Sequence, residues 1–320
     1  MNLAGKLLCH IGLNYKRYNV MYEILNFFKH PNLIGVALMN RTGYLFDDVT
    51  YLKIMHWLRM GSKLHLENPL TYSEKSQWLK LYDRNPLYTT MVDKYAVKKF
   101  VTDIIGEEYV VPALGVYDHF DDIDFDKLPK SFVMKCTHDS GSVVIVPDKD
   151  DFDKEAARTK LEHGLTIDYF QGNREWPYKD VPRKILIEEY IPSLGKRDSI
   201  EYKLTTCNGE VKFITICGGI AHAAFELRTN DHFTKEWQQL HWYASYKPSG
   251  KKIEKPAIMD QVIELSERLA KHTPYLRVDW YVLEDKVYFG EMTFHTWGGF
   301  PDFKPMDFNR TLGDWIKLPR

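Results

Sequence analysis

The sequence has little cysteine, and its cysteines are scattered. The chain of 320 residues contains Cys9, Cys136, Cys207 and Cys217, with no C-x-x-C pair among them. This scatter argues against a cysteine-based zinc site and against a disulfide framework. We interpret these residues as buried or incidental thiols in a reducing compartment. We therefore expect a cytoplasmic protein, with peripheral attachment to a membrane as the alternative.

The sequence also lacks a surplus of charge and a long hydrophobic run. Its 43 Lys and Arg residues balance 44 Asp and Glu residues, and no basic run suggests a nucleic-acid groove. The most apolar run, Leu33–Met39, is too short to cross a bilayer, and the first twenty residues lack the continuous apolar core of a signal peptide. We expect no nucleic-acid partner and no transmembrane segment.

The order of the expected elements predicts an α+β protein of several lobes. Hydrophobic residues make up 44% of the chain, which is ample for packed cores. A mainly helical region is expected over residues 1–85, and Asn85-Pro86 opens the next segment. An α+β lobe over residues 86–190 and a β-rich lobe with helices over residues 191–320 would then enclose a cleft.

The most informative stretch lies near the C-terminus. Residues 276–283 and 287–294 are rich in Val, Trp, Tyr and Phe, which predicts two antiparallel strands. If Glu284-Asp285-Lys286 forms the whole turn, Leu283 lies opposite Val287.

This register sets Asp279 opposite Glu291 and Arg277 opposite Thr293. Directly opposed residues share a face of a sheet, and a slip of one residue would separate the two carboxylates. The expected opposite face carries Trp280, Val282, Tyr288 and Phe294.

Two opposed carboxylates predict a bound cation. Like charges directly opposite each other destabilise a sheet, and a cation between them removes that cost. Mg²⁺ prefers oxygen ligands and is commonly held by one or two carboxylates together with substrate phosphates. The alternative interpretation is a solvated face with an Arg–Asp pair.

A second pair of expected strands encloses a loop suited to phosphate. Ser131–Cys136 and Val143–Pro147 flank Ser140-Gly141-Ser142. Small side chains let backbone N–H groups approach a phosphate, and Lys135 adds a point charge. An ordinary hairpin turn is the alternative.

Three more segments supply candidate residues. Lys94 and Lys98 share one face of an amphipathic helix over residues 91–101, as surface charges or as a phosphate contact. Residues 184–191 form an apolar strand that contains two acids. A hairpin turning at Cys207-Asn208-Gly209 carries Glu201 and Lys203 on one face of its first strand.

In this order, the segments resemble the ATP-grasp superfamily, and within it the TupA-like proteins of bacterial surface-polysaccharide biosynthesis. The resemblance covers roughly residues 65–300. It is carried by NPLTYSEKSQWLKLYD, VDKYAVKKFV, SFVMKCTHDSGSVVIV, ILIEEYI, EYKLTTCNGEVKFI and RVDWYVLEDKVYFGEMTF. It implies an ATP-grasp fold, in which two α+β lobes, a lid lobe and a C-terminal lobe with the metal site, clamp ATP.

The resemblance also implies which residues contact the nucleotide. Lys94 and Lys135 match the phosphate lysines, and Ser140-Gly141-Ser142 matches the flexible loop over the phosphates, although only one glycine is present here. Glu188-Glu189-Tyr190-Ile191 matches the hinge that reads adenine through backbone groups. Glu201 matches a ribose contact.

The remaining implied residues surround the reacting atoms. Asp279 and Glu291 match the two magnesium carboxylates, and Lys203 matches a contact to the γ-phosphate or acyl-phosphate. Arg277 matches the arginine that stabilises a tetrahedral intermediate in peptide-forming relatives. Thr293 stands where the family usually has Asn, so its part in metal binding differs from the pattern.

The reaction that the resemblance implies is ATP- and Mg²⁺-dependent ligation of a carboxylate to an amine through an acyl-phosphate. The expected substrates are a carboxylate on a bacterial surface polysaccharide, such as a capsule, O-antigen or teichuronic-type glycan, and an amine. His295, Trp297 and the segment 218–233, expected to be a loop, are candidates to line the acceptor pocket; core packing is the alternative.

Three other functions fit parts of the sequence. A nucleotide-sugar glycosyltransferase would use the acidic clusters Asp121-Asp122 and Asp151–Asp153, which also fit solvated caps. A kinase would stop at phosphoryl transfer. A binding protein with a degenerate site is disfavoured, because Lys135, Asp279 and Glu291 are all present.

Overall fold

The computed structural model describes residues 31–192, 200–219, 228–283 and 286–319. The chain divides into two compact units, residues 1–64 and residues 65–320. The predicted domain limits at residues 85 and 190 stay predictions. No helix in the described ranges is long and apolar enough to cross a membrane.

The first unit is helical in its described residues, 31–64, as the sequence predicts. It contains α3 (Pro31–Thr42) and α4 (Asp48–Met60). Asp47 caps α4 by accepting a hydrogen bond from the backbone N–H of Thr50 at 3.0 Å. Gly61 ends the helix with φ of +68°, a conformation that glycine adopts without a steric penalty.

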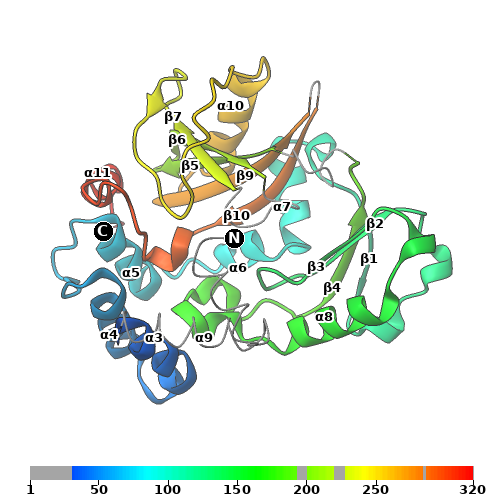
Figure 1. Cartoon of the computed structure of the whole chain (residues 1–320), viewed down its shortest axis with the longest axis horizontal. Coiled ribbons are helices and arrows are strands. Elements are labelled where there is room, and N and C mark those ends of the chain that lie inside the picture. The colour runs from blue at the N-terminus through cyan, green and yellow to red at the C-terminus, as the bar shows by residue number, and fades with distance from the viewer. Residues whose placement is uncertain (1–30, 193–199, 220–227, 284–285, 320) are drawn as a thin grey trace, which may run out of the picture. The chain divides into compact units, whose positions relative to one another are not determined.

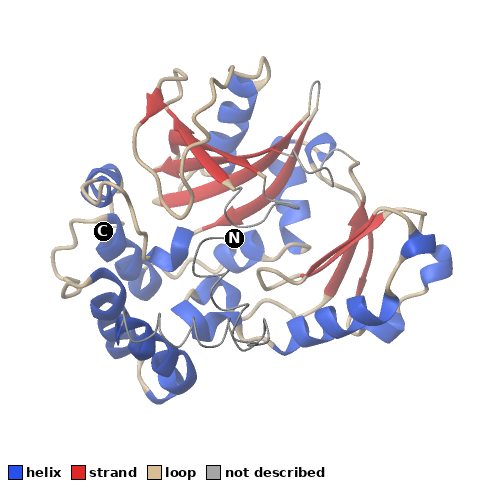
Figure 2. Ribbon diagram, viewed as in Figure 1, coloured by secondary structure: helices blue, strands red, loops and turns tan. Residues whose placement is uncertain are grey.

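The second unit contains two antiparallel sheets (Figures 1 and 2). The smaller sheet has the strand order β1-β4-β2-β3, and α8 (Lys154–Thr166) packs on it through Leu161. Its strands are β1 (Ala113–Tyr117), β2 (Phe132–Cys136), β3 (Val143–Val146) and β4 (Ile185–Glu189).

The larger sheet has the strand order β10-β9-β5-β6-β7-β8. Helix α10 (Met259–Leu269) covers one face because Val262, Leu265 and Leu269 recur at helical spacing and join the sheet's core. The strands are β5 (Ile200–Cys207), β6 (Glu210–Gly218), β7 (Thr229–Phe233), β8 (Gln239–Leu240), β9 (Tyr275–Val282) and β10 (Val287–Thr293).

Shorter elements connect and cover the sheets. Helix α7 packs in the same core as α10 and the larger sheet. The helices are α5 (Tyr72–Tyr82), α6 (Leu87–Val92), α7 (Ala96–Ile105), α9 (Tyr169–Asn173) and α11 (Phe308–Trp315). In the described residues the 3₁₀ turns of the second unit are η2 (Glu107–Tyr109), η3 (Phe120–Asp122), η4 (Phe125–Lys127), η5 (Lys149–Asp151), η6 (Trp176–Tyr178) and η8 (Thr296–Gly299). The turn η1 (Gly43–Leu45) belongs to the first unit.

The β9–β10 hairpin confirms the pairing of the candidate metal ligands. Asp279 lies opposite Glu291, and Arg277 lies opposite Thr293. The expected pairing of Leu283 with Val287 is wrong, because Val287 pairs with Val282. A bulge at Gly290 absorbs the extra residue and restores the predicted register beyond it.

The bulge also changes which side chain of β10 faces the core. Tyr288 pairs with Tyr281 and so shares the face of Asp279, contrary to the prediction that it lies beside Trp280. Phe289 takes that place opposite Trp280 and is 5% exposed. A local turn rule assumes a regular ladder, so it could not foresee this exchange.

Two further expectations have clear outcomes. The turn at Asn208-Gly209 is confirmed, with φ of +53° and +82° at its two central residues. The expected loop over residues 218–233 is wrong in its last part, because Thr229–Phe233 is a strand paired with β6. Residues 220–227 lie outside the described ranges.

Candidate functional site

A cleft of about 490 Å³ lies between the two sheets and brings most of the predicted residues together. The smaller sheet contributes Lys135 and Glu188, and the larger sheet contributes Lys203 and Asp279. The predicted residues that line the cleft are Lys94, Lys135, Gly141, Glu188, Glu189, Tyr190, Ile191, Glu201, Lys203, Asp279 and Glu291. Ser140, Ser142, Arg277 and Thr293 are not among the residues that line it.

Alternate side chains of a strand lie on opposite faces of a sheet, and in the larger sheet the charged ones face the cleft. On β5, Glu201 and Lys203 point into the cleft, while Tyr202 and Leu204 are buried in the core beneath α10. Lys203 pairs directly with Asp279 on the next strand. The cross-strand row Glu291–Asp279–Lys203 therefore lies on one face of three adjacent strands.

Asp279 is held by two cations. Its Oδ1 accepts from Nε of Arg277 at 2.6 Å, and its Oδ2 accepts from Nη2 of Arg277 at 2.7 Å and from Nζ of Lys203 at 2.6 Å. Arg277 also reaches Oε1 of Glu291 at 2.9 Å, and Lys203 reaches Oε2 of Glu201 at 3.0 Å. The five side chains form one ion-pair network.

Burial and pairing act in opposite directions on this network. Burial alone would raise the pKa of Asp279, but Arg277 and Lys203 outweigh it and hold that pKa below its ordinary value. Burial alone would lower the pKa of Lys203 and of Arg277, but Asp279 raises both. All three groups are therefore charged at neutral pH.

The carboxylates of Asp279 and Glu291 suit Mg²⁺ as part of a ligand set that water and phosphate would complete. Within the described ranges, no group of three or more His, Cys, Asp and Glu side chains could hold a metal ion by itself. Asp279 and Glu291 provide hard oxygen donors on neighbouring strands, which suits an ion that takes its other ligands from water and phosphate. The predicted participation of Thr293, opposite Arg277, stays a prediction.

A second ion-pair set lies across the cleft. Glu188 pairs with both Lys135 and Lys98, and the Lys98 ammonium also donates to the carbonyl of Val111 at 2.6 Å. Burial tends to raise the pKa of Glu188, but the two lysines lower it below its ordinary value. Glu188 therefore positions Lys135 of β2, which was predicted to contact phosphate, and adjacent sequence did not reveal this role.

The loop between β2 and β3 is fixed at its base and open at its tip. The Ser142 hydroxyl donates to the buried carboxylate of Asp139, and Lys94 donates to the Asp139 carbonyl. Burial lowers the pKa of Lys94. Gly141 is exposed, has φ of +110° and has no atom near the position of a Cβ. The tip thus offers backbone groups to the cleft, whereas Ser142 braces the loop.

The residues predicted to contact adenine lie at the end of β4. Glu189, Tyr190 and Ile191 line the cleft at the end of β4. The N–H of Glu189 donates to the carbonyl of Pro112 at 3.1 Å. The backbone N–H of Glu189 is therefore already used inside the fold.

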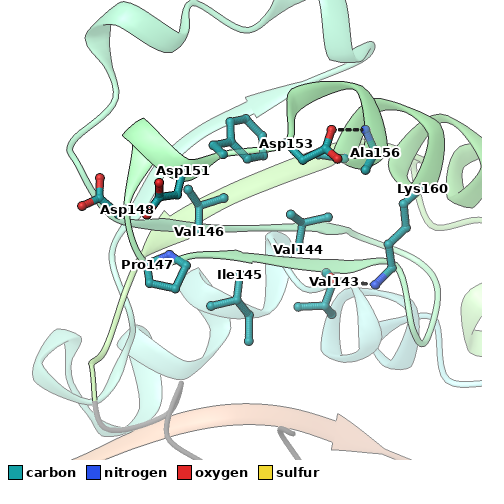
Figure 3. Close-up of a pocket in the computed structure, with 12 residues that line it drawn as sticks. Val143, Val144, Ile145, Val146, Pro147, Asp148, Asp151, Asp153, Ala156 and Lys160 are labelled. Carbon is teal, nitrogen blue, oxygen red and sulfur yellow. Dashed lines mark hydrogen bonds between the residues drawn. The ribbon is translucent and has the colours of Figure 1, made fainter.

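Lys160 is a cleft residue that sequence reasoning missed. It projects from α8, donates to the carbonyl of Val143 at 2.7 Å and borders the cleft. On the other side of β3 it borders a second hollow of about 370 Å³, lined by β3 and the start of α8 (Figure 3). The packing of α8 brings this lysine to the cleft, so no local motif marks it.

Of the acceptor-pocket candidates, His295 is buried and Trp297 is half-buried. His295 is 4% exposed and its Nδ1 lies 3.3 Å from the Ser76 hydroxyl of α5. Burial holds the pKa of His295 well below its usual range. Trp297 packs edge-on against Phe303, with ring centroids 5.1 Å apart. Neither residue is among those that line the cleft.

Comparison with known proteins decides the family. The model of the TupA-like ATP-grasp family matches residues 74–317. The chain belongs to this family. The predicted family and the predicted ATP-grasp fold are thereby confirmed.

Solved structures similar to this TupA-like protein are titled as ATP-grasp proteins and ligases. D-alanine–D-alanine ligase of Bacillus anthracis is 22% identical, with a TM-score of 0.36, over 69% of this chain and 58% of that one. The Helicobacter pylori ligase is 15% identical, with a TM-score of 0.42, over 79% and 69%. A RimK-domain ATP-grasp protein of Sphaerobacter thermophilus is 15% identical, with a TM-score of 0.40, over 73% and 70%.

The TupA-like protein thus spans less than two thirds of the length of the Bacillus anthracis ligase. No curated protein matches it by sequence.

Proposed function

We propose that the protein is an ATP- and Mg²⁺-dependent ligase that joins a carboxylate to an amine through an acyl-phosphate. The observation that carries this proposal is the network of Glu291, Asp279, Arg277 and Lys203 on one wall of a cleft whose other wall presents Lys135. Such a cleft can neutralise a triphosphate along its length. Family membership supports the same conclusion.

The chain's own residues would align and neutralise the reacting groups. A substrate carboxylate oxygen attacks the γ-phosphorus and displaces ADP, and an amine then attacks the acyl carbon, loses a proton and displaces phosphate. Lys135 and Lys203 hold phosphate oxygens in line, which lowers the cost of bringing like charges together. Arg277 lies beside Asp279, where it can stabilise the oxyanion on the acyl carbon.

Asp279 and Glu291 would hold magnesium, which supplies charge neutralisation on the phosphate oxygens when bound. Lys203 and Arg277 keep Asp279 ionised and therefore ready to accept a cation.

We further propose a sugar carboxylate of a bacterial surface polysaccharide, such as a capsule, O-antigen or teichuronic-type glycan, as the first substrate. An amino acid or an amino sugar would supply the amine. The reaction would then take place in the cytoplasm, where ATP is available. These finer assignments rest on the resemblance to proteins of polysaccharide biosynthesis.

Trapping with hydroxylamine tests the reaction class. Incubation with Mg·ATP, D-glucuronate or D-galacturonate, and hydroxylamine should give ADP, phosphate and a hydroxamate in equal amounts. Formation of ADP with a stable phosphorylated sugar and no hydroxamate would show a kinase instead. Release of a nucleoside diphosphate from UDP- or GDP-sugars, with no ATP turnover, would show a glycosyltransferase.

A further inference from the structure

The helical unit of residues 1–64 carries a net charge opposite in sign to that of the rest of the chain. It has eight Lys and Arg residues against three Asp and Glu residues, a net charge of +5, whereas the whole chain has −1. Residues 65–320 therefore carry a net charge of −6. In the described part of the first unit, Arg41, Lys53 and Lys63 are exposed. This asymmetry predicts that the first unit meets an anionic partner.

Helices α3 and α4 of this unit each bury one side. Gly35 of α3 lies against Leu58 of α4, and the Asn32 amide donates to the carbonyl of Leu58 at 3.3 Å (Figure 1). The buried apolar side chains of the two helices are Met39, Tyr51, Leu52 and Met55. Packing of these helices therefore does not account for apolar side chains on their other sides.

Large apolar side chains nevertheless lie on those other sides, next to cations. Ile34 and Leu38 are four residues apart on α3, and Arg41 follows on the same side of the helix. On α4, Lys53 and Trp57 are also four residues apart, and both are exposed. The most exposed apolar side chains of the described part of this unit, from 48% to 71%, are those of Ile34, Leu38, Tyr44, Leu45 and Trp57.

This mixture of side chains fits a lipid surface better than a protein or a nucleic acid. The cores of protein interfaces are depleted of Lys, and nucleic-acid interfaces are polar. An anionic bilayer accepts both kinds of group, because Leu and aromatic side chains enter the boundary between headgroups and acyl chains while Lys and Arg meet lipid phosphates. Tyr and Trp are the aromatic residues enriched at that depth.

We propose that α3, the segment Gly43–Phe46 and the exposed side of α4 form a docking surface for an anionic lipid bilayer. The net charge of +5 attracts the first unit to lipid phosphates, while the net charge of −6 keeps residues 65–320 from binding the same surface. Leu38, Tyr44, Leu45 and Trp57 then enter the headgroup boundary. This inference does not depend on the proposed ligase function, because vesicle binding needs neither nucleotide nor turnover.

Co-sedimentation of the full chain with lipid vesicles tests this surface. The probes are vesicles of phosphatidylcholine alone and vesicles that also contain about 30 mol% phosphatidylglycerol. We expect the chain to bind the anionic vesicles at least about tenfold more tightly than the neutral ones. Binding should weaken as NaCl rises from about 0.1 M to about 0.5 M, because salt screens the charges.

Four variants separate the apolar part of the surface from the charged part. Leu38→Ser and Trp57→Ser should each weaken binding to the anionic vesicles at least about fivefold, because each removes apolar area from the contact. Lys53→Gln and Lys63→Gln should each weaken it about fivefold, the value of one cation near an anionic surface. The Kd for ATP should stay within about twofold in all four variants, since none of these side chains lines the cleft.

Leu87→Ser and Lys251→Gln are the matched controls, because both side chains are exposed but belong to the second unit. Both variants should bind the anionic vesicles as the unmodified chain does. Equal binding to the two kinds of vesicle, or equal binding by the four variants and the unmodified chain, would overturn the proposal.

Failure of the unmodified chain to bind anionic vesicles would also overturn it, and two measurements would then show what covers the surface. A lower free energy of unfolding in Leu38→Ser and Trp57→Ser would assign the surface to residues 1–30 of the same chain. A dimer of the unmodified chain that Leu38→Ser dissociates in analytical ultracentrifugation would assign it to a second copy.

Discussion

At the scale of single residues, Asp279 is the carboxylate that Arg277 and Lys203 share. Both of its oxygens accept hydrogen bonds from cations, and its side chain is only 6% exposed. Glu291, its partner across the strands, is 45% exposed and has one ion pair with Arg277. The two carboxylates thus share a proposed function but differ in what they contribute to stability.

Neutralising each carboxylate should separate these two contributions. Asp279→Asn and Glu291→Gln should each lower Mg²⁺-dependent ATP turnover by about 10²–10³-fold. Asp279→Asn should also lower the free energy of unfolding by about 3–5 kcal/mol, because Arg277 and Lys203 lose a buried counter-charge. Glu291→Gln should change it by less than about 0.5 kcal/mol.

The measurements are ADP release and urea unfolding, with the exposed Asp302→Asn as the control. Full turnover in both active-site variants would remove the metal assignment.

Lys135 and its neighbours permit a matched comparison of lysines. Lys135→Met should raise the Kd for ATP about 10–100-fold, because a charged hydrogen bond to phosphate is lost. Lys98→Met should have a smaller effect, since Glu188 keeps its pair with Lys135. Lys99→Met, on the exposed side of the same helix, should leave binding unchanged. Isothermal titration with ATP measures the Kd of each variant. An equal loss of ATP affinity in all three variants would contradict the prediction.

At the scale of elements, the bulge in β10 sets the position of Glu291. A Cβ added at Gly290 would lie 3.0 Å from the carbonyl oxygen of Asp279 and 3.5 Å from its Cβ. Glycine therefore lets the two carboxylate-bearing strands approach closely where the register shifts.

Gly290→Ala should push the strands apart at this point. We expect a loss of about 1–2 kcal/mol in the free energy of unfolding and at least about a tenfold loss of turnover, because Glu291 moves relative to Asp279. Gly172→Ala in α9 is the control, since a Cβ there meets no atom within 4 Å. Unfolding and ADP release measure both effects; unchanged turnover in Gly290→Ala would show that the bulge does not position Glu291.

The strand β7 carries a buried histidine that makes stability depend on pH. His232 is 1% exposed, its Nδ1 lies 2.9 Å from the Thr215 hydroxyl, and its ring stacks on Trp242 at 3.7 Å. Burial lowers the pKa of His232 from 6.5 to about 3. The unfolded chain takes up this proton below about pH 6.5, whereas the folded chain does not until about pH 3.

The contribution of His232 to stability is therefore complete above pH 6.5 and is lost as the pH falls toward 3. Each pH unit in that window costs about 1.4 kcal/mol. His232→Gln should remove about that much of the stability difference between pH 7.0 and pH 5.5 in urea unfolding. The part of the pH dependence of the unfolding free energy that is due to His295 should remain. His272 is exposed, so His272→Gln should keep the full pH dependence. If the unfolding free energy depended equally on pH in the unmodified protein and in both variants, His232 would not be the source of this dependence.

At the scale of the whole molecule, the cleft lies between two sheets that are built from successive parts of the chain. Lys135 and Glu188 belong to the smaller sheet, and Lys203 and Asp279 belong to the larger one. A nucleotide between them would bridge both sheets and stabilise the unit of residues 65–320 in proportion to its binding.

Nucleotide binding should thus raise the melting temperature of the full chain. At a free Mg·ATP concentration about 100 times its Kd, the free energy of unfolding should rise by about 2.7 kcal/mol. ATP without Mg²⁺ should stabilise less, and UDP- and GDP-sugars should not stabilise at all. A thermal-shift series with these ligands makes the comparison; stabilisation by a nucleotide sugar alone would favour the glycosyltransferase.

The sequence by itself determined those features that depend on neighbouring residues. The turn at Asn208-Gly209 and the helix around Val262 and Leu265 follow from turn chemistry and local periodicity. The apposition of Asp279 and Glu291 was predicted from the hairpin, but it also depends on the bulge at Gly290. The ordered motifs were also sufficient to predict the family.

Only the tertiary structure decided the partners of those residues. Lys203 reaches Asp279 from 76 positions away, and Glu188 joins Lys98 to Lys135. The physical reason is that a strand's sequence sets which side chains share its face, whereas the order of strands in a sheet depends on packing between distant segments.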